Sequence, residues 1–373
     1  MGGQAVSSWK EIGSRVATAR KAARLTQENL AHEMGLNRTA ITRIESGQRE
    51  LDARELAHLA EFLERPLPWF LSVPDAALAG RRAALDARAP HRADALLEDL
   101  ADGVGQMSDF GLLKAVPFRV TRNLVTFEDA ERAAEETRSR IGKGSEPLWN
   151  LCRVAEGLGL FACSLRLQDD RVDGAYAVHD AGGVAVVNGD FESGRRRFTL
   201  AHEIGHHVFQ DEYANDRDVS TSTDQRERLI NAFAIYLLMP RDAVNARWTE
   251  LTAVHDVWHS ALRLGVRFGV SWTALVLHLK NLDLIDGRAY TELVHRRPVG
   301  ADYLEHDLSL YDDLRPPRVP PSYAAAVAKA HRAGRISRSR TIELLLGTIG
   351  EDDLPRLEPH RMAVLRSELS ALS

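Results

Sequence analysis

The stretch FTLAHEIGH, from Phe198 to His206, decides the fold of the largest part of the chain. Its apolar residues recur at three- and four-residue spacing, which predicts a helix with one face against a core. His202 and His206 lie four residues apart, so both imidazoles project from one side of that helix and can bind one metal ion. Glu203 follows the first histidine, where its carboxylate can act on a water bound to the ion. The pattern indicates the chemistry of a zinc peptidase rather than ordinary polar residues on a helix.

A catalytic zinc needs a third protein ligand, because its fourth position stays open for water. The downstream candidates are one more histidine and six acids: His207, Asp211, Glu212, Asp216, Asp218, Asp224 and Glu227. His207 points about 100° round the helix from its neighbour, and the acids up to Asp224 lie in a polar stretch that predicts a loop. Glu227 begins a predicted helix from about Gln225 to Met239, on the face that packs on the core. We therefore expect Glu227 to join the two histidines.

These segments resemble the ImmA/IrrE family of metallopeptidases. The resemblance is carried by RFTLAHEIGH at 197–206, by Glu227 four residues before NAFA at 231–234, and by LLMP at 237–240, and it extends from about residue 128 to about residue 284. It implies that His202, His206 and Glu227 bind zinc and that Glu203 is the general base. Two histidines and a carboxylate also suit other divalent ions such as manganese.

In such a site, zinc makes hydroxide available at neutral pH, and Glu203 moves the proton from water to the leaving amine. The oxyanion also needs a stabilising group besides the metal. His207, Tyr213, Tyr236 and His255 are the alternatives, and the sequence does not choose among them.

A second unit is predicted at the N-terminus, where residues from Ile12 to about Leu71 form short amphipathic helices with tight turns. Thr26 and Asn37 are predicted N-caps of two of these helices. In the helix over 38–45, apolar residues face inward, and the polar residues left outward are Arg38, Thr39, Thr42 and Arg43. A helix with exposed Arg and Thr suits the major groove of DNA.

The segments LTQENLA at 25–31 and ITRIESG at 41–47 resemble the phage-repressor (Xre/Cro) type of helix-turn-helix. The resemblance implies a five-helix domain whose DNA face holds Gln27, Arg38, Thr39, Thr42 and Arg43. It also implies binding as a homodimer to a palindromic operator. The alternative is a small helical domain that binds protein through a solvated basic face.

Composition limits the classes of function. The 373 residues are 44% hydrophobic and 27% charged, which is typical of globular domains. The net charge of −5 gives no overall attraction to nucleic acid, so DNA binding must come from a local basic surface. Cys152 and Cys163 are too few for a disulfide framework and are expected to be buried. Without a signal core or an apolar run of ~20 residues, we expect a cytoplasmic protein with no membrane partner.

The fold class is therefore α+β and mainly helical, in four parts. We expect a helix-turn-helix domain at 1–74, a helical connector at 75–115, a zincin-like metallopeptidase domain at 116–315 and a helical C-terminal tail at 316–373 that contacts protein. In the third part, strands at 160–167, 174–179 and 184–188 predict a small antiparallel sheet before the HExxH helix. Arg195 to Arg197 are expected on the surface or beside substrate carboxylates, and the prolines from Pro316 to Pro321 predict a linker.

The expected function is a DNA-binding regulator joined to a zinc endopeptidase. Family analogy suggests that it cleaves a protein, such as a helix-turn-helix repressor, in a stress or mobile-element response. Two alternatives keep the DNA-binding part without peptidase turnover: a transcriptional repressor whose zinc domain senses a partner, and an antitoxin that binds a toxin. The intact Glu203 argues against a purely structural zinc, which fills its fourth position with a protein ligand.

Overall fold

Residues 8–23, 25–63, 65, 67–71, 92–114, 118–120, 123–179, 181–210 and 220–354 are described by the computed structural model. The chain divides into two units, Met1–Asp102 and Gly103–Ser373. The division falls within helix α7 (Arg92–Asp109), which is the described part of the predicted connector. Residues 75–91 and 115 of the predicted connector lie outside the described residues.

Five helices occupy the described residues from 9 to 71, as predicted. They are α1 (Trp9–Ala22), α2 (Gln27–Glu33), α3 (Arg38–Glu45), α4 (Ala53–Phe62) and α5 (Leu67–Leu71). Thr26 accepts a hydrogen bond from Asn29 N and Asn37 accepts one from Ala40 N, so both predicted N-caps are present. Gly35 has a φ of 62°, which explains the sharp turn between α2 and α3. The helices enclose a core of their own, and its fully buried side chains include Val16, Leu30, Ile41, Ile44, Leu59 and Phe70.

A three-stranded sheet lies at the centre of the second unit. Its strands are β1 (Leu160–Leu165), β2 (Gly174–His179) and β3 (Gly182–Asn188), in the order β1-β3-β2. β2 and β3 are antiparallel, but β1 and β3 are parallel, so the sheet is mixed and the prediction of a purely antiparallel sheet was wrong. The connection over 166–173 carries the chain past β3 to the far edge. Asn188 holds that connection, since its amide donates to the carbonyls of Asp169 and Val172.

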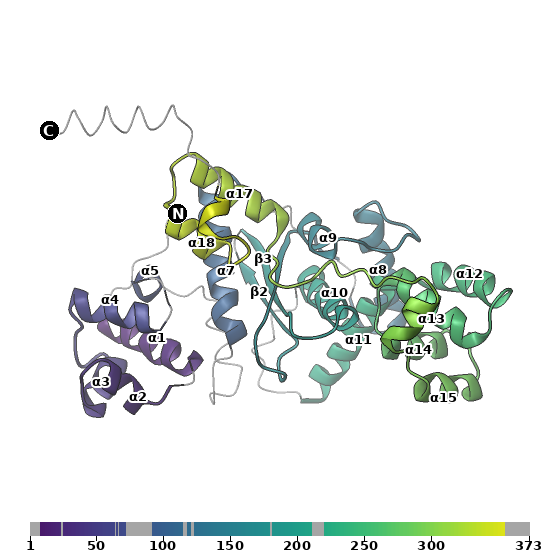
Figure 1. Cartoon of the computed structure of the whole chain (residues 1–373), viewed down its shortest axis with the longest axis horizontal. Helices are drawn as coiled ribbons and strands as arrows, with labels where there is room; N and C mark the ends of the chain where they lie inside the picture. The colour runs from purple at the N-terminus through teal and green to yellow at the C-terminus, as the bar shows by residue number, and fades with distance from the viewer. Residues whose placement is uncertain are drawn as a thin grey trace. The chain divides into compact units, whose positions relative to one another are not determined.

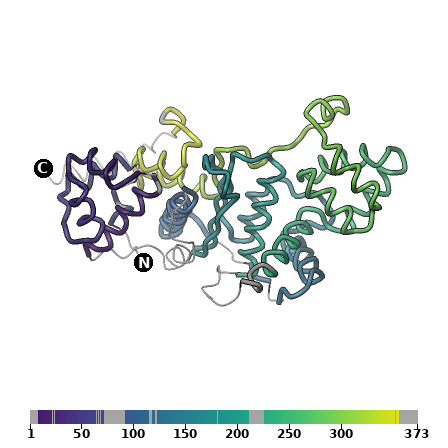
Figure 2. The backbone as a smooth tube through the Cα atoms, turned by 90° about the horizontal axis from the view of Figure 1, so that it is seen from below, coloured from purple at the N-terminus to yellow at the C-terminus, as the bar shows by residue number. Residues whose placement is uncertain are grey.

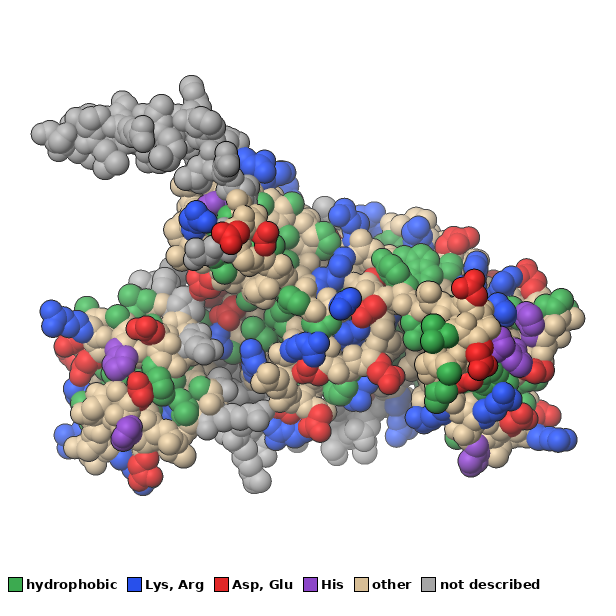
Figure 3. Space-filling model, viewed as in Figure 1, with side chains coloured by type: hydrophobic (Ala, Val, Ile, Leu, Met, Phe, Trp, Pro, Cys, Tyr) green, Lys and Arg blue, Asp and Glu red, His purple; other side chains and the backbone are tan. Residues whose placement is uncertain are grey.

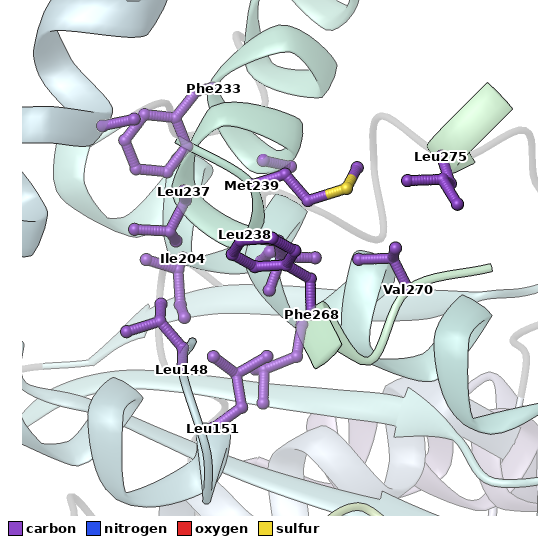
Figure 4. Close-up of a cluster of buried hydrophobic side chains, with 14 of the residues drawn as sticks. Leu148, Leu151, Ile204, Phe233, Leu237, Leu238, Met239, Phe268, Val270 and Leu275 are labelled. Carbon is purple, nitrogen blue, oxygen red and sulfur yellow. The ribbon is translucent and has the colours of Figure 1, made fainter. Parts of the chain in front are cut away.

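Helices cover the sheet and extend the unit (Figure 1). Before the sheet come α8 (Phe127–Arg140) and α9 (Leu151–Gly157), and after it come α10 (Ser193–Phe209) and α11 (Ser220–Leu238). A further group follows: α12 (Arg241–Thr252), α13 (Val257–Phe268), α14 (Trp272–Asn281), α15 (Gly287–His295) and α16 (Gly300–Glu305). One core joins these helices to the sheet. In Figure 4, Ile204 of α10 lies among Phe233 and Leu237 of α11 and Phe268 of α13.

The arginine run at the start of α10 is largely structural. Arg195 is exposed and pairs with Asp173, but Arg196 is buried against Gly189 O and Asp312, at 3.1 and 2.6 Å. Arg197 is fully buried; its guanidinium donates to Asp313 at 2.5 Å and to the carbonyls of Gly269 and Leu148. The expectation of a surface run was therefore wrong for the last two arginines, because buried acceptors from distant segments satisfy them.

The segment with the four prolines packs on the sheet rather than forming a free linker. Arg318 exchanges two backbone hydrogen bonds of 2.9 Å with Ser164, which pairs the segment with the edge of β1. Helices α17 (Pro321–Arg332) and α18 (Arg338–Leu344) follow, with a short 3-10 turn at Glu351–Asp353. Tyr323 of α17 donates to Leu344 O, and Gly103 of α7 lies so close that a Cβ there would be 2.1 Å from the tyrosine oxygen. Figure 2 shows the yellow C-terminal helices beside the end of the blue helix α7 that belongs to the same unit, residues 103–109.

The surface carries both charge signs. Acidic and basic side chains are interspersed over the face seen in Figure 3, with apolar groups between them. No helix within the described ranges is both long and apolar enough to cross a membrane. The mainly helical α+β class, with its helix-turn-helix unit, small sheet and helical C-terminal region, is confirmed.

Candidate metal centre

The side chains of His202, His206 and Glu227 converge on one point. The two histidine Nε2 atoms are 2.9 Å apart, and the Glu227 carboxylate oxygens lie 3.4 Å from His202 Nε2 and 3.6 Å from His206 Nε2. Ligands at the usual 2.0–2.1 Å around a tetrahedral zinc are ~3.3 Å apart. The donor set and its spacing therefore fit a zinc ion. Within the described ranges, this is the only group of three or more such ligands that meets.

A glycine in the motif brings the two ligand helices together. A Cβ on Gly205 would lie 3.0 Å from both Ile230 Cγ2 and Phe233 Cδ1, so side chains of α11 pack directly on the backbone of α10 at this point. Glu227 stands one helical turn before Ile230 on α11. The close approach thus brings its carboxylate within reach of histidines on the other helix.

Asn231 orients the first histidine. Its Oδ1 lies 2.9 Å from His202 Nδ1, so the ring donates from Nδ1 and turns the lone pair of Nε2 toward the other two ligands. Burial lowers the pKa of His202, although the hydrogen bond that its ring donates to Asn231 and the charge of Asp173 act in the opposite direction. A neutral imidazole is the form that binds a metal. Asn231, four residues after Glu227 on α11, therefore orients the proposed metal ligand His202 on α10.

Glu203 is 3% exposed and lies beneath the start of strand β2. A Cβ on Gly174 would be 2.8 Å from Glu203 Oε1 and 2.6 Å from Thr199 Cγ2. The absence of a side chain at Gly174 therefore leaves the space that this carboxylate fills. The signal in the sequence was a glycine at the start of a strand, and its meaning appears only when α10 packs under β2.

His207 does not belong to the cluster. Its Nε2 donates to Leu158 O at 2.9 Å, and its Nδ1 lies 3.2 Å from the hydroxyl of Tyr176. Burial lowers the pKa of this imidazole, which is consistent with a neutral core residue. The ring faces the sheet, on a side of α10 away from the other two imidazoles, as its position round the helix led us to expect. The acids of 211–219 lie outside the described residues, and the side chain of Asp224 is not described.

The other groups considered for the oxyanion have different surroundings. The Tyr236 hydroxyl accepts a hydrogen bond from Arg241 at 3.1 Å, and burial raises its pKa. His255 is half-buried in the turn between α12 and α13, and Tyr213 lies outside the described residues.

The predicted DNA face lies on α2 and α3. Arg38, Thr39, Thr42 and Arg43 are exposed, as the helical phase requires once Ile41 and Ile44 face the core. Gln27 is half-buried: its amide donates to Glu45 Oε2 at 2.8 Å and accepts from the Thr42 hydroxyl at 3.3 Å. Glu45 also takes two bonds from Arg20 of α1. Glu45 of α3 thus ties α1 and α2 together through Arg20 and Gln27.

Comparisons with known proteins find one family match in the region of the candidate metal centre and another in the region of the predicted DNA face. Residues 155–280 match the family model of the IrrE N-terminal-like domain (Peptidase_M78), and residues 16–70 match the helix-turn-helix model. No curated protein sequence gives a significant match.

Among solved structures, a Mycobacterium tuberculosis transcriptional regulator is 19% identical, with a TM-score of 0.30 over 49% of this chain and 51% of that one. Bacillus thuringiensis PlcR, in complex with the peptide PapR7 and DNA, is 11% identical, with a TM-score of 0.17 over 90% and 91% of the two chains. The chain thus spans about half the length of the first of these structures. By these family matches, the chain carries a helix-turn-helix domain at residues 16–70 and an IrrE N-terminal-like domain at residues 155–280.

Proposed function

We propose that this protein is a DNA-binding regulator whose second unit is a zinc-dependent endopeptidase that cleaves a protein partner. The observation that supports the peptidase is the convergence of two imidazoles and a carboxylate, with a buried carboxylate on the residue next to one of the imidazoles. A purely structural zinc site has four protein ligands and no use for a general base. Three ligands and an adjacent acid suit hydrolysis instead.

His202, His206 and Glu227 would hold the ion, which when bound supplies a polarised water and a Lewis acid. Glu203 would be the general base, which takes a proton from the attacking water and passes it to the leaving amine. Asn231 keeps His202 in the tautomer that offers Nε2. In this proposal Glu203 moves the proton, three residues hold the ion, and Asn231 orients one of those three.

The sheet provides a place for an extended substrate. β2 is an edge strand, paired only with β3 among the described residues, and its first residue lies against Glu203. A polypeptide that adds as a further strand along β2 would bring a backbone carbonyl toward the proposed general base. The opposite edge of the sheet is covered, since β1 is paired with Arg318.

The helix-turn-helix unit would bind operator DNA through Arg38, Thr39, Thr42 and Arg43 of α3, with Gln27 positioning Thr42, and as a dimer on a palindromic site. The substrate class that we favour is a protein repressor cleaved under stress or on a mobile-element signal. Binding to DNA would bring the peptidase close to a repressor on the same DNA.

The test compares cells that express the full chain with cells that express Glu203→Gln, by mass spectrometry of new protein N-termini. Glu250→Gln on the exposed face of α12 is the matched control for loss of one carboxylate. We expect a repressor fragment with the unchanged chain and with Glu250→Gln, and none with Glu203→Gln. A fragment that persists with Glu203→Gln would exclude the peptidase and leave a regulator that acts without cleavage.

A further inference from the structure

A second feature of the unit adjoins the metal cluster: a pocket of about 600 Å³ between α11 and α14. This volume falls in the range of sites that enclose small ligands. Its lining is mainly apolar and includes Phe127, Phe198, Ile235, Ala274 and Leu277. It is therefore a formed cavity that an apolar group could fill.

Two residues connect the pocket to the candidate centre. Asn231 lines the pocket and also accepts the hydrogen bond from His202. Phe198 lines it as well, one helical turn before His202 on α10. Any group that fills the pocket is thus adjacent to the side chains that would hold the metal.

Two polar side chains of the lining, His278 and Tyr236, are neutral at pH 7. His278 is 1% exposed and donates from Nε2 to Met239 O at 3.0 Å, and burial lowers its pKa to about 4. The Tyr236 hydroxyl has a raised pKa and accepts from Arg241. The charged residue that lines the pocket is Arg228, which is exposed. The charge of Arg241 behind Tyr236 is already paired with Glu131 at 2.6 Å. A charged occupant would therefore lose its hydration there without gaining an unpaired counter-charge.

We propose that this pocket binds a large apolar side chain, aromatic or long aliphatic, of the substrate residue next to the bond that is cleaved. This inference rests on the proposed peptidase function and names its sequence preference. Ala232 and Ala274 determine the size of that side chain, because they line the pocket from different helices and leave its volume open. Leu277, half of whose side chain is exposed, forms an apolar rim.

The substitution that tests the inference is Ala274→Leu, which fills the pocket from a helix that carries none of the three proposed ligands. Thr273→Leu is its matched control, since it adds a similar side chain at the next, exposed position of α14, outside the pocket lining. Leu277→Ala removes rim surface at an exposed position and leaves the core intact. Circular dichroism establishes that each variant is folded.

The first measurement needs no metal. The ¹⁹F line width of N-acetyl-4-fluorophenylalanine amide is recorded with the metal-free full chain. We expect broadening with the unchanged chain and with Thr273→Leu, weaker broadening with Leu277→Ala, and none with Ala274→Leu. Equal broadening with all four proteins would overturn the inference, because the probe would then bind elsewhere.

The second measurement separates this inference from the proposed function. The zinc-loaded chain is titrated calorimetrically with acetohydroxamate, which reads the metal alone, and with 4-fluorophenylalanine hydroxamate. Burial of the aromatic ring is expected to strengthen binding by about tenfold or more, and Ala274→Leu should abolish that gain. Equal affinities for the two probes would refute the pocket and leave the metal centre standing. No binding of acetohydroxamate would refute the metal centre, and the pocket's role with it.

Discussion

Removal of the carboxylate at Asp313 should destabilise the second unit more than any exposed substitution. Asp313 Oδ2 accepts from Arg197 at 2.5 Å and from Leu151 N at 2.8 Å, and both charged side chains are fully buried. Asp313→Ala leaves the Arg197 guanidinium without its counter-charge and Leu151 N without its acceptor. Breaking a buried ion pair in this way costs about 3–5 kcal/mol.

The shift in melting temperature follows from that cost. For a domain somewhat smaller than this unit, one kcal/mol corresponds to about 2–4 °C, so Asp313→Ala should lower the Tm by roughly 6–20 °C. Asp313→Asn keeps an oxygen acceptor and loses only the charge, so it should cost less, about 1–3 kcal/mol. Arg197 lies five residues before His202 on α10, so the same change should loosen the helix that carries the proposed ligands.

Differential scanning calorimetry of the full chain measures this series, with the transition of the second unit followed separately from that of the first. The matched control is Glu250→Ala, which removes the carboxylate of an exposed pair 2.6 Å from Arg247 and should cost less than about 1 kcal/mol. If Asp313→Ala lowers the Tm no more than Glu250→Ala does, the buried Arg197–Asp313 pair does not stabilise the second unit, and the physical reasoning is wrong.

Three further predictions concern the candidate centre, the DNA face and the pH dependence of stability. Asn231→Leu should weaken zinc binding by about 10–100-fold in competition with a chromophoric chelator. Asn231→Asp keeps an acceptor for His202 and should retain most of the zinc affinity. An equal loss of affinity in both variants would refute the orienting role. Arg43→Ala should weaken operator binding and reduce its salt dependence in fluorescence anisotropy, while Arg54→Ala on the exposed face of α4 should not; equal effects would remove α3 from the interface. His278 has a pKa lowered to about 4 by burial, so between pH 6.5 and 4 the unfolded chain takes up a proton that the folded chain does not. Unfolding free energy should therefore fall by about 1.4 kcal/mol per pH unit as the pH drops, and His278→Gln should lack this part of the slope in urea titrations; an unchanged slope would contradict it.

The sequence by itself determined the features that depend on neighbours along the chain. The four-residue spacing of His202 and His206 and the phase of the apolar residues were sufficient to predict a core-facing helix with both imidazoles on one side. The same local signals predicted the capped helices α2 and α3 and the exposure of Arg43. Each is set within one or two helical turns, where backbone geometry fixes which side chains share a face.

Only the tertiary structure decided which residues from distant segments come into contact. The side chain of Glu227 comes within 3.6 Å of both histidines because Gly205 lets two helices approach, and Arg197 is buried because an aspartate more than a hundred residues later meets it. The parallel pairing of β1 with β3 and the pocket between α11 and α14 likewise depend on contacts between segments far apart in the sequence. Periodicity reports which face of an element is buried, but the partner on that face is chosen by packing of the whole core.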